Sequence, residues 1–227
     1  MRDADPNRTR HLFPAELDRA SGFGFGAKAR GGRRAVGLLG GSFNPAHEGH
    51  RYISEQALKR LRLDQVWWMV SPQNPLKSRA EMASHADRMA SAQAMAKHPR
   101  IKVTDIESRI GLAHTADVLQ RLTKRYPRIR FVWLMGADNL AGIHRWKRWH
   151  KIFMTVPIAV FARPSYDSRA LAGLAATRFQ AARLPERKAP SLAFRDPPAW
   201  VFLAIRRHPA SATEIRAHRG FPGAGRG

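Results

Sequence analysis

The stretch Gly40-Gly41-Ser42-Phe43-Asn44-Pro45-Ala46-His47-Glu48-Gly49-His50 follows a short apolar run at 35–39. That apolar run is typical of a buried strand. Paired glycines after a strand allow the backbone to turn and to approach a ligand without interference from Cβ atoms. We expect the Asn-Pro step to close the loop as a turn and to start a helix, because Asn tolerates unusual backbone angles and Pro suits a first helical turn.

His47 and His50 are three residues apart and therefore share one face of the opening turn of that helix. Backbone N–H groups and the helix dipole already attract anions to such a turn. The pattern predicts a phosphate site that uses both imidazoles. The same spacing would suit a pair of surface histidines or a metal site, but a metal site lacks the third protein ligand that zinc requires.

A second polar constellation lies near the C-terminus, in the segment Ser211-Ala212-Thr213-Glu214-Ile215-Arg216. By themselves, the Ser and Thr side chains are typical of a helix cap. Together with the Arg they predict a second anion site at a helix start, able to hold a triphosphate tail.

Both segments resemble signatures of the nucleotidylyltransferase superfamily. The first matches Gly-Gly-(Ser/Thr)-Phe-(Asp/Asn)-Pro-x-His-x-Gly-His at every defined position, and the second is similar to Ser-(Ser/Ala)-Thr-x-Ile-Arg. Two phosphate sites at opposite ends of one chain suit an ATP molecule that is bound across a sheet.

Four segments in the middle of the chain narrow the resemblance. They are Ser71–Lys77, Gly111–Asp117, Met135–Leu140 and Trp146–Trp149. In this order they resemble bacterial nicotinate-nucleotide adenylyltransferase, and the resemblance covers about residues 35–219. The family transfers the AMP moiety of ATP to nicotinate mononucleotide and releases pyrophosphate, as a step of NAD biosynthesis.

The resemblance implies a role for each candidate site residue. The catalytic residues would be His47, His50 and Arg216. The ATP-binding residues would be Gly40, Gly41, Ser42, Phe43, His47, His50, Gly136, Asp138, Ser211, Thr213 and Arg216. Nicotinate mononucleotide would contact Ser42, Lys77, Thr115 and Trp146. The cofactor would be Mg²⁺ bound through the ATP phosphates, with no metal site made entirely by the protein.

Within these sets we expect His47 at the α-phosphate and His50 at the neighbouring phosphate oxygens. Neither needs to act as a base, because the attacking phosphate is already ionised at pH 7. Asp138 would accept from ribose hydroxyls, Trp146 would stack on the pyridine ring and Thr115 would meet the nicotinate carboxylate. For Trp146 and Trp149, the structural alternative is core or surface packing.

Apolar runs and helical stretches alternate from residue 35 onward, which predicts βαβ units. Expected strands are 35–39, 65–70, 101–104, 129–135, 157–161 and 199–205. Expected helices are 47–62, 84–97, 114–126, 138–152 and 168–179, and 184–198 is expected to be a long loop. The fold class is therefore α/β: a Rossmann-like doubly wound parallel sheet with helices on both faces, of the HxGH nucleotidylyltransferase type.

The expected organisation is a flexible basic leader at 1–33, a nucleotidylyltransferase domain at 34–219 and a Gly-rich tail at 220–227. No apolar stretch approaches the length of a membrane helix, so we expect no membrane partner. The absence of cysteine excludes disulfides, thiolate metal sites and thiol nucleophiles. We expect a cytoplasmic enzyme of unknown oligomeric state.

The formal charge of +23 favours anionic partners. It is typical of nucleic-acid binding, but the basic residues are dispersed along the chain and no nucleic-acid module accompanies them. We expect ATP and nicotinate mononucleotide as partners and no specific nucleic acid. The alternatives are a related transferase that acts on nicotinamide mononucleotide, phosphopantetheine or flavin mononucleotide, a basic nucleic-acid-binding protein that retains the fold, and an inactive regulatory relative.

Overall fold

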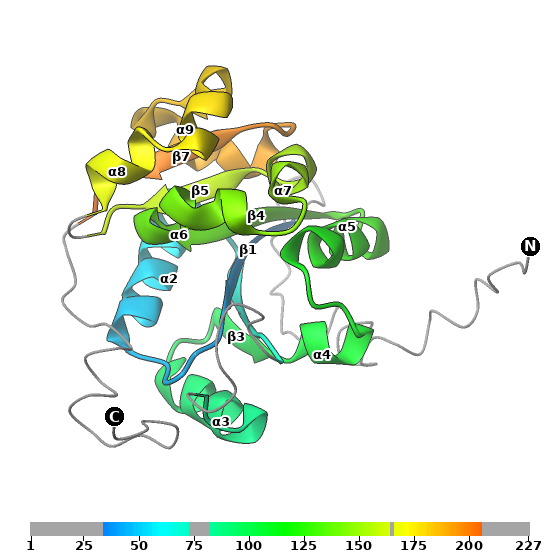
Figure 1. Ribbon diagram of the computed structural model, residues 1–227. Coiled ribbons are helices and arrows are strands. Elements are labelled where there is room, and N and C mark those ends of the chain that lie inside the picture. The colour runs from blue at the N-terminus through cyan, green and yellow to red at the C-terminus, as the bar shows by residue number, and fades with distance from the viewer. Residues whose placement is uncertain (1–33, 73–81, 164–165, 206–227) are drawn as a thin grey trace, which may run out of the picture.

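The computed structural model describes residues 34–72, 82–163 and 166–205 (Figure 1). Several predictions of the preceding subsection concern residues outside these ranges. They are the leader 1–33, the tail 220–227, Lys77, Ser211, Thr213 and Arg216.

A seven-stranded sheet forms the centre of the described part of the chain. Its order is β3-β2-β1-β4-β5-β7-β6, and every neighbouring pair is parallel. The strands are β1 (Arg34–Gly41), β2 (Gln65–Val70), β3 (Ile101–Thr104), β4 (Ile129–Gly136), β5 (Ile158–Phe161), β6 (Arg183–Leu184) and β7 (Trp200–Leu203). The chain leaves β1 toward β2 on one side and returns to β4 on the other, which is the doubly wound arrangement.

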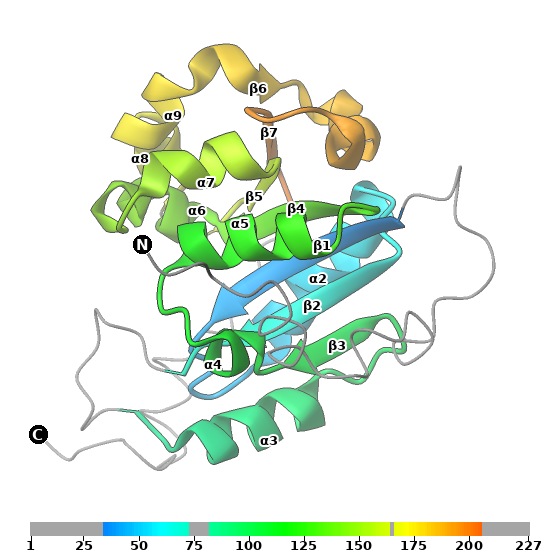
Figure 2. The same ribbon diagram turned by 90° about the vertical axis from the view of Figure 1, so that its right-hand side faces the viewer.

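Helices cover both faces of this sheet. One face carries α4 (Ile106–Ile110), α5 (Thr115–Arg125), α6 (Ala137–Gly142), η4 (Ile143–Arg145), α7 (Trp149–Thr155), α8 (Asp167–Leu171) and α9 (Leu174–Arg178). The other carries α2 (Glu48–Arg60), α3 (His85–Met95) and η6 (Glu186–Phe194), while the short η5 (Gln180–Ala182) leads into β6. Figure 2 shows α5 in front of the sheet and α2 behind it. The predicted fold class is confirmed.

Alternation along the strands divides the core into two layers. On β4, Phe131 and Trp133 face the layer that contains α5, whereas Val132 and Leu134 face the layer that contains α2. The strands β2 and β5 are buried along their whole length, because a parallel sheet covered on two faces keeps its central strands from water. Within the described residues, no helix has both the length and the apolar character needed to cross a membrane.

The predicted bounds of β2 and β3 are confirmed residue for residue. The continuous helix predicted at 168–179 is wrong, because Gly173 adopts an extended conformation and separates α8 from α9. The long loop predicted at 184–198 is also wrong. Residues 186–194 form η6, in which Ala189 and Leu192 are buried against the sheet, so apolar burial outweighs the loop tendency of the neighbouring prolines.

Candidate active site

The candidate site lies where the central strands end. The register pairs Gly41 with Val70 and Gly136 with Phe161, so β1, β2, β4 and β5 end side by side at their carboxyl edge. Strand order reverses between β1 and β4, and ligands of doubly wound folds bind in the crevice at such a point. The loops that follow these strands therefore share one edge of the sheet.

The paired glycines have a different role from the predicted turn. Gly40 and Gly41 are the last residues of β1, not part of the loop. A Cβ atom on Gly40 would lie 2.4 Å from Cη2 of Trp133, so the glycine makes room for the indole ring that crosses over it. The prediction that the glycines form the turn is wrong, because the residue with positive φ is Phe43 at 47°.

Phe43 fixes the loop through its ring. It is buried and stacks on Trp68, with ring centroids 5.1 Å apart and planes 20° apart, and its other neighbour is the His50 ring at 4.8 Å. A left-handed conformation is costly for a bulky residue, on the order of 1 kcal/mol or more, and this packing holds it in place. Asn44 and Pro45 form the predicted turn, but the helix begins only at Glu48.

The two histidines close the start of α2 as a reciprocal cap. His47 is the N-cap residue, and its Nδ1 accepts a hydrogen bond from the backbone N–H of Gly49 at 3.1 Å. The backbone N–H of His47 in turn donates to Nδ1 of His50 at 3.2 Å. The two ring centroids are 3.9 Å apart. The predicted pairing of these side chains is thus present in the structure.

This cap determines the proton positions on both rings. Each Nδ1 accepts a backbone hydrogen bond, so a neutral imidazole carries its proton on Nε2. Burial lowers the pKa of His50 well below its usual value, with further lowering by His47 and Arg163 and an opposing hydrogen bond from the His47 backbone. His50 is therefore a neutral N–H donor at pH 7.

The adenosine side of the predicted site also has a defined geometry. Asp138, in the first turn of α6, accepts a hydrogen bond from Nη1 of Arg163 through Oδ2 at 2.7 Å. Its Oδ1 lies 2.5 Å from the position of a Cβ on Gly136, so a side chain at position 136 would displace this carboxylate. The same Oδ1 is buried and has no partner among the described residues, so it is available to a ligand hydroxyl.

The sequence reasoning missed Arg163. It lies just beyond β5, and Oδ1 of Asp167 holds its backbone N–H at 2.8 Å. Its guanidinium donates to Asp138 of α6 and its charge contributes to lowering the pKa of His50 at the start of α2. The available signal was a basic residue immediately after a strand that ends at the ligand-binding edge.

The residues predicted to bind the acceptor lie just after η4 and at the start of α5. Trp146 is half-buried and meets Trp133 edge-on, with centroids 6.5 Å apart at 83°. Trp149 packs edge-on against Phe153 and Phe179, so it belongs to the core layer. Thr115 is half-buried at the first position of α5, where His114 is the N-cap residue and its side chain forms no capping bond.

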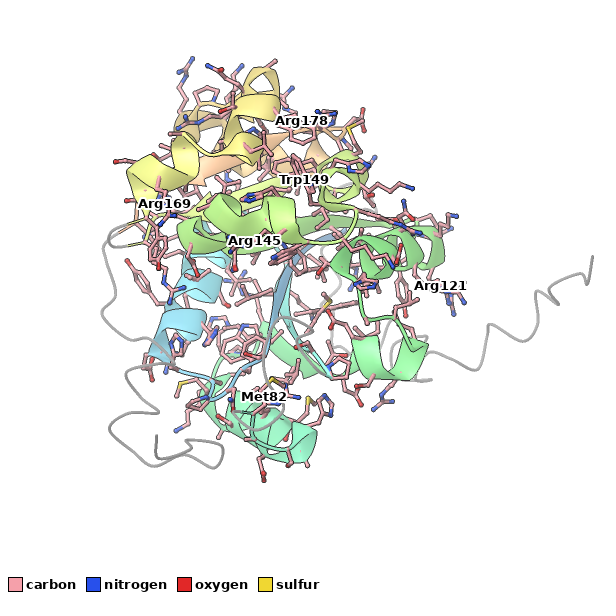
Figure 3. The ribbon with its side chains drawn as sticks, viewed as in Figure 1. Met82, Arg121, Arg145, Trp149, Arg169 and Arg178 are labelled. Atoms are coloured by element: carbon pink, nitrogen blue, oxygen red, sulfur yellow. The ribbon has the colours of Figure 1, made fainter. Side chains whose placement is uncertain are left out.

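Basic side chains project from several helices in the described part of the chain. Figure 3 labels Arg121 on α5, Arg145 on η4, Arg169 on α8 and Arg178 on α9, which project from separate helices. The basic side chains of the described residues therefore do not gather on one helix. Within the described residues, no cluster of three or more His, Cys, Asp or Glu side chains is arranged to hold a metal ion.

The fold and the site define a class of protein. A cytidylyltransferase-like family model matches residues 38–218. The structure of nicotinic acid mononucleotide adenylyltransferase from Plasmodium falciparum, complexed with NaAD, is similar with a TM-score of 0.62 at 17% identity and covers 82% of this chain and 83% of that one. At this identity the likeness shows the fold. The chain belongs to the cytidylyltransferase-like nucleotidyltransferases.

Its sequence relatives identify the particular family. A protein of Parvibaculum lavamentivorans is 53% identical over 82% of this chain and 92% of its own length. A protein of Methylorubrum extorquens is 50% identical over 80% of this chain and 98% of its own. Both are described as "probable nicotinate-nucleotide adenylyltransferase". The chain belongs to the nicotinate-nucleotide adenylyltransferase family, and this predicted resemblance is confirmed.

Proposed function

We propose that the protein transfers the AMP moiety of ATP to nicotinate mononucleotide, giving nicotinate adenine dinucleotide and pyrophosphate for NAD biosynthesis. Family membership supports the reaction, and the reciprocal cap of His47 and His50 is the observation that carries the mechanism. Because each Nδ1 accepts a backbone hydrogen bond, each ring presents an Nε2–H donor at the loop where β1 ends. Such donors suit phosphate oxygens, and neither ring has an unoccupied nitrogen that could accept a proton as a general base.

The reaction requires little of the protein beyond positioning and charge stabilisation. The 5′-phosphate of the mononucleotide attacks the α-phosphorus of ATP, the bond to the bridging oxygen breaks, and pyrophosphate leaves with the electron pair. His47 donates to the α-phosphate and His50 to neighbouring oxygens. Fixed donors stabilise the developing charge better than water does, because they need no reorganisation.

Asp138 and Arg163 extend the site toward the nucleoside. The free Oδ1 of Asp138 accepts from ribose hydroxyls, while Arg163 orients that carboxylate and adds positive charge beside His50. On the acceptor side, Trp146 stacks on the pyridine ring and the N-terminus of α5 at Thr115 meets the nicotinate carboxylate. Ser42 contacts both substrates at the end of β1.

The remaining roles concern residues outside the described ranges and the metal. Lys77 contacts the mononucleotide phosphate, and Ser211, Thr213 and Arg216 hold the leaving phosphates. Mg²⁺ bound together with ATP would neutralise phosphate charge. Within the described residues, the carboxylate of Asp138 supplies oxygen donors of the kind that Mg²⁺ prefers. Cytoplasmic location remains a prediction.

Pyrophosphate release with ATP and a panel of acceptors tests this function. We expect rapid release with nicotinate mononucleotide and much slower release with the amide, because the helix N-terminus at Thr115 favours a carboxylate. Phosphopantetheine and flavin mononucleotide should be poor acceptors, since neither presents a pyridine ring to Trp146. A better rate with either of them would overturn the assignment of the acceptor.

A further inference from the structure

Arg88 is a charged residue enclosed by backbone oxygens. Only 1% of it is exposed, and its guanidinium lies beneath the loops that leave β1 and β2. Nη1 donates to the carbonyl of Ser42 at 2.8 Å and to that of Ser71 at 2.7 Å. Nη2 donates to the carbonyl of Pro72 at 2.8 Å, and Nε to that of Ala83 at 3.2 Å. One side chain thus joins three segments of the chain.

Two further contacts attach the α3 region to the loop at 42–46. The Asn44 Oδ1 accepts from the backbone N–H of Ala83 at 3.2 Å. Ser91 Oγ accepts from the backbone N–H of Ala46 at 3.1 Å. Together with the bond from Arg88 to Ser42, these contacts fix every second residue of the loop that precedes His47.

The charge of Arg88 has no acidic partner in the described part of the chain. Its hydrogen bonds end on neutral carbonyls, and no ion pair joins it to a carboxylate among those residues. Burial lowers the pKa of Arg88, but a guanidinium stays protonated in proteins. Buried charges are usually paired, so an unpaired cation beneath an anion-binding loop leaves positive potential for a ligand.

We propose that Arg88 is a positioning residue for the transfer reaction. It holds the carbonyls of Ser42, Ser71 and Pro72 in one arrangement, so that the loop presents its N–H groups and His47 to the phosphates, and its charge favours the anions bound there. This inference rests on the proposed function for its kinetic consequence, but the tethering of the loop can be measured independently of activity.

The test compares Arg88→Met and Arg88→Lys with the wild-type protein. We expect Arg88→Met to lower kcat/KM for nicotinate mononucleotide by about 10²-fold, since a misplacement of about 1 Å has such an effect. Lys keeps the charge and loses the planar fork, so Arg88→Lys should keep KM near the wild-type value and lower kcat by about 10-fold. Amide hydrogen exchange at 42–46 should be faster in both variants.

Arg100→Met serves as the control, because Nη1 of Arg100 also donates to a carbonyl, that of Leu63, at the opposite edge of the sheet. It should leave kcat, KM and exchange at 42–46 unchanged. A folded Arg88→Met protein with wild-type kcat and KM would refute the positioning role, whatever its melting temperature. If Arg88→Met does not fold, Arg88→Lys carries the test, and a folded Arg88→Lys protein with wild-type kcat and unchanged exchange at 42–46 would refute the role.

The two proposals fail in different ways. An inactive wild-type protein whose exchange at 42–46 nevertheless accelerates in Arg88→Met would contradict the proposed function and support the tether. An active wild-type protein with unchanged exchange and kinetics in Arg88→Met would support the function and contradict the inference about Arg88.

Discussion

Replacement of Gly40 by Ala tests the contact that joins the signature segment to the core. The added Cβ would lie 2.4 Å from Cη2 of Trp133, about 1 Å closer than an ordinary contact, which begins at 3.4 Å. Trp133 is only 2% exposed and has the Trp146 ring against it, so it cannot swing into water. Overpacking of this kind typically destabilises by about 1–3 kcal/mol. At about 3 °C per kcal/mol for a chain of this size, the melting temperature should fall by about 3–9 °C.

A double-mutant cycle measures whether this contact is the cause. Trp133→Phe removes the ring atoms that meet the new methyl group, together with an indole N–H that has no partner among the described residues. Urea unfolding of wild type, Gly40→Ala, Trp133→Phe and the double variant gives the coupling free energy. We expect the free energy of unfolding of the double variant to exceed, by at least about 1 kcal/mol, the value that the two single variants predict by addition.

Gly41→Ala is the matched control, because a Cβ on Gly41 would lie 3.4 Å from the Phe43 ring, at the edge of ordinary contact. It should change stability by less than about 0.5 kcal/mol. An additive cycle, or a Gly41→Ala variant as unstable as Gly40→Ala, would show that the glycine serves some purpose other than accommodating Trp133.

Further predictions concern the site, pH and the ends of the chain. His47→Ala should lower kcat by about 10²–10³-fold with little loss of stability, and an unchanged kcat with a normal melting temperature would exclude the phosphate contact. Burial raises the pKa of Glu107 from 4.5 to about 7, so the folded state binds its proton more tightly than the unfolded state and the stability should fall as pH rises from 4.5 to 7. The Glu107→Gln variant should be more stable than the wild type by on the order of 3 kcal/mol at pH 8 and nearly equal to it at pH 4. Equal stability differences at both pH values in urea titrations would contradict this. Because the lowered pKa keeps His50 neutral, kcat should be flat between pH 6.5 and 8, and a bell-shaped profile centred there would contradict its role as a neutral donor. Deletion of residues 1–33 should leave kcat nearly unchanged and deletion of 211–227 should abolish it, and a folded, fully active tail deletion would reduce the second signature to a helix cap.

Strand positions could be predicted from the sequence because their apolar runs are short and bounded by polar residues. The bounds of β2 and β3 follow from this pattern alone. The reason for Gly40 could not be predicted, since it depends on which residue of β4 lies beside β1 in the register. A periodic pattern describes one segment at a time and contains no information on neighbours across the sheet.

In the candidate site, too, local features could be predicted and features that depend on distant contacts could not. The pairing of His47 and His50 could be predicted because both belong to one helical turn. The sequence offered only a weak signal for Arg163, a basic residue just after a strand, and none for Arg88, because each acts through partners far along the chain, such as Asp138 for Arg163 and Ser42 for Arg88. In a chain rich in arginine, the few that are buried or placed at the ligand edge resemble the many that are solvated.

In the proposed mechanism the protein positions the 5′-phosphate of the mononucleotide against the α-phosphate of ATP and forms no covalent bond with either substrate. The stereochemical course at the α-phosphorus, followed with ATP that carries a chiral α-thiophosphate, tests this claim most directly. A single in-line displacement inverts the configuration in the nicotinate adenine dinucleotide product, and we expect inversion. Retention would require two displacements through an adenylyl-enzyme and would contradict the proposed roles of His47 and His50 as donors.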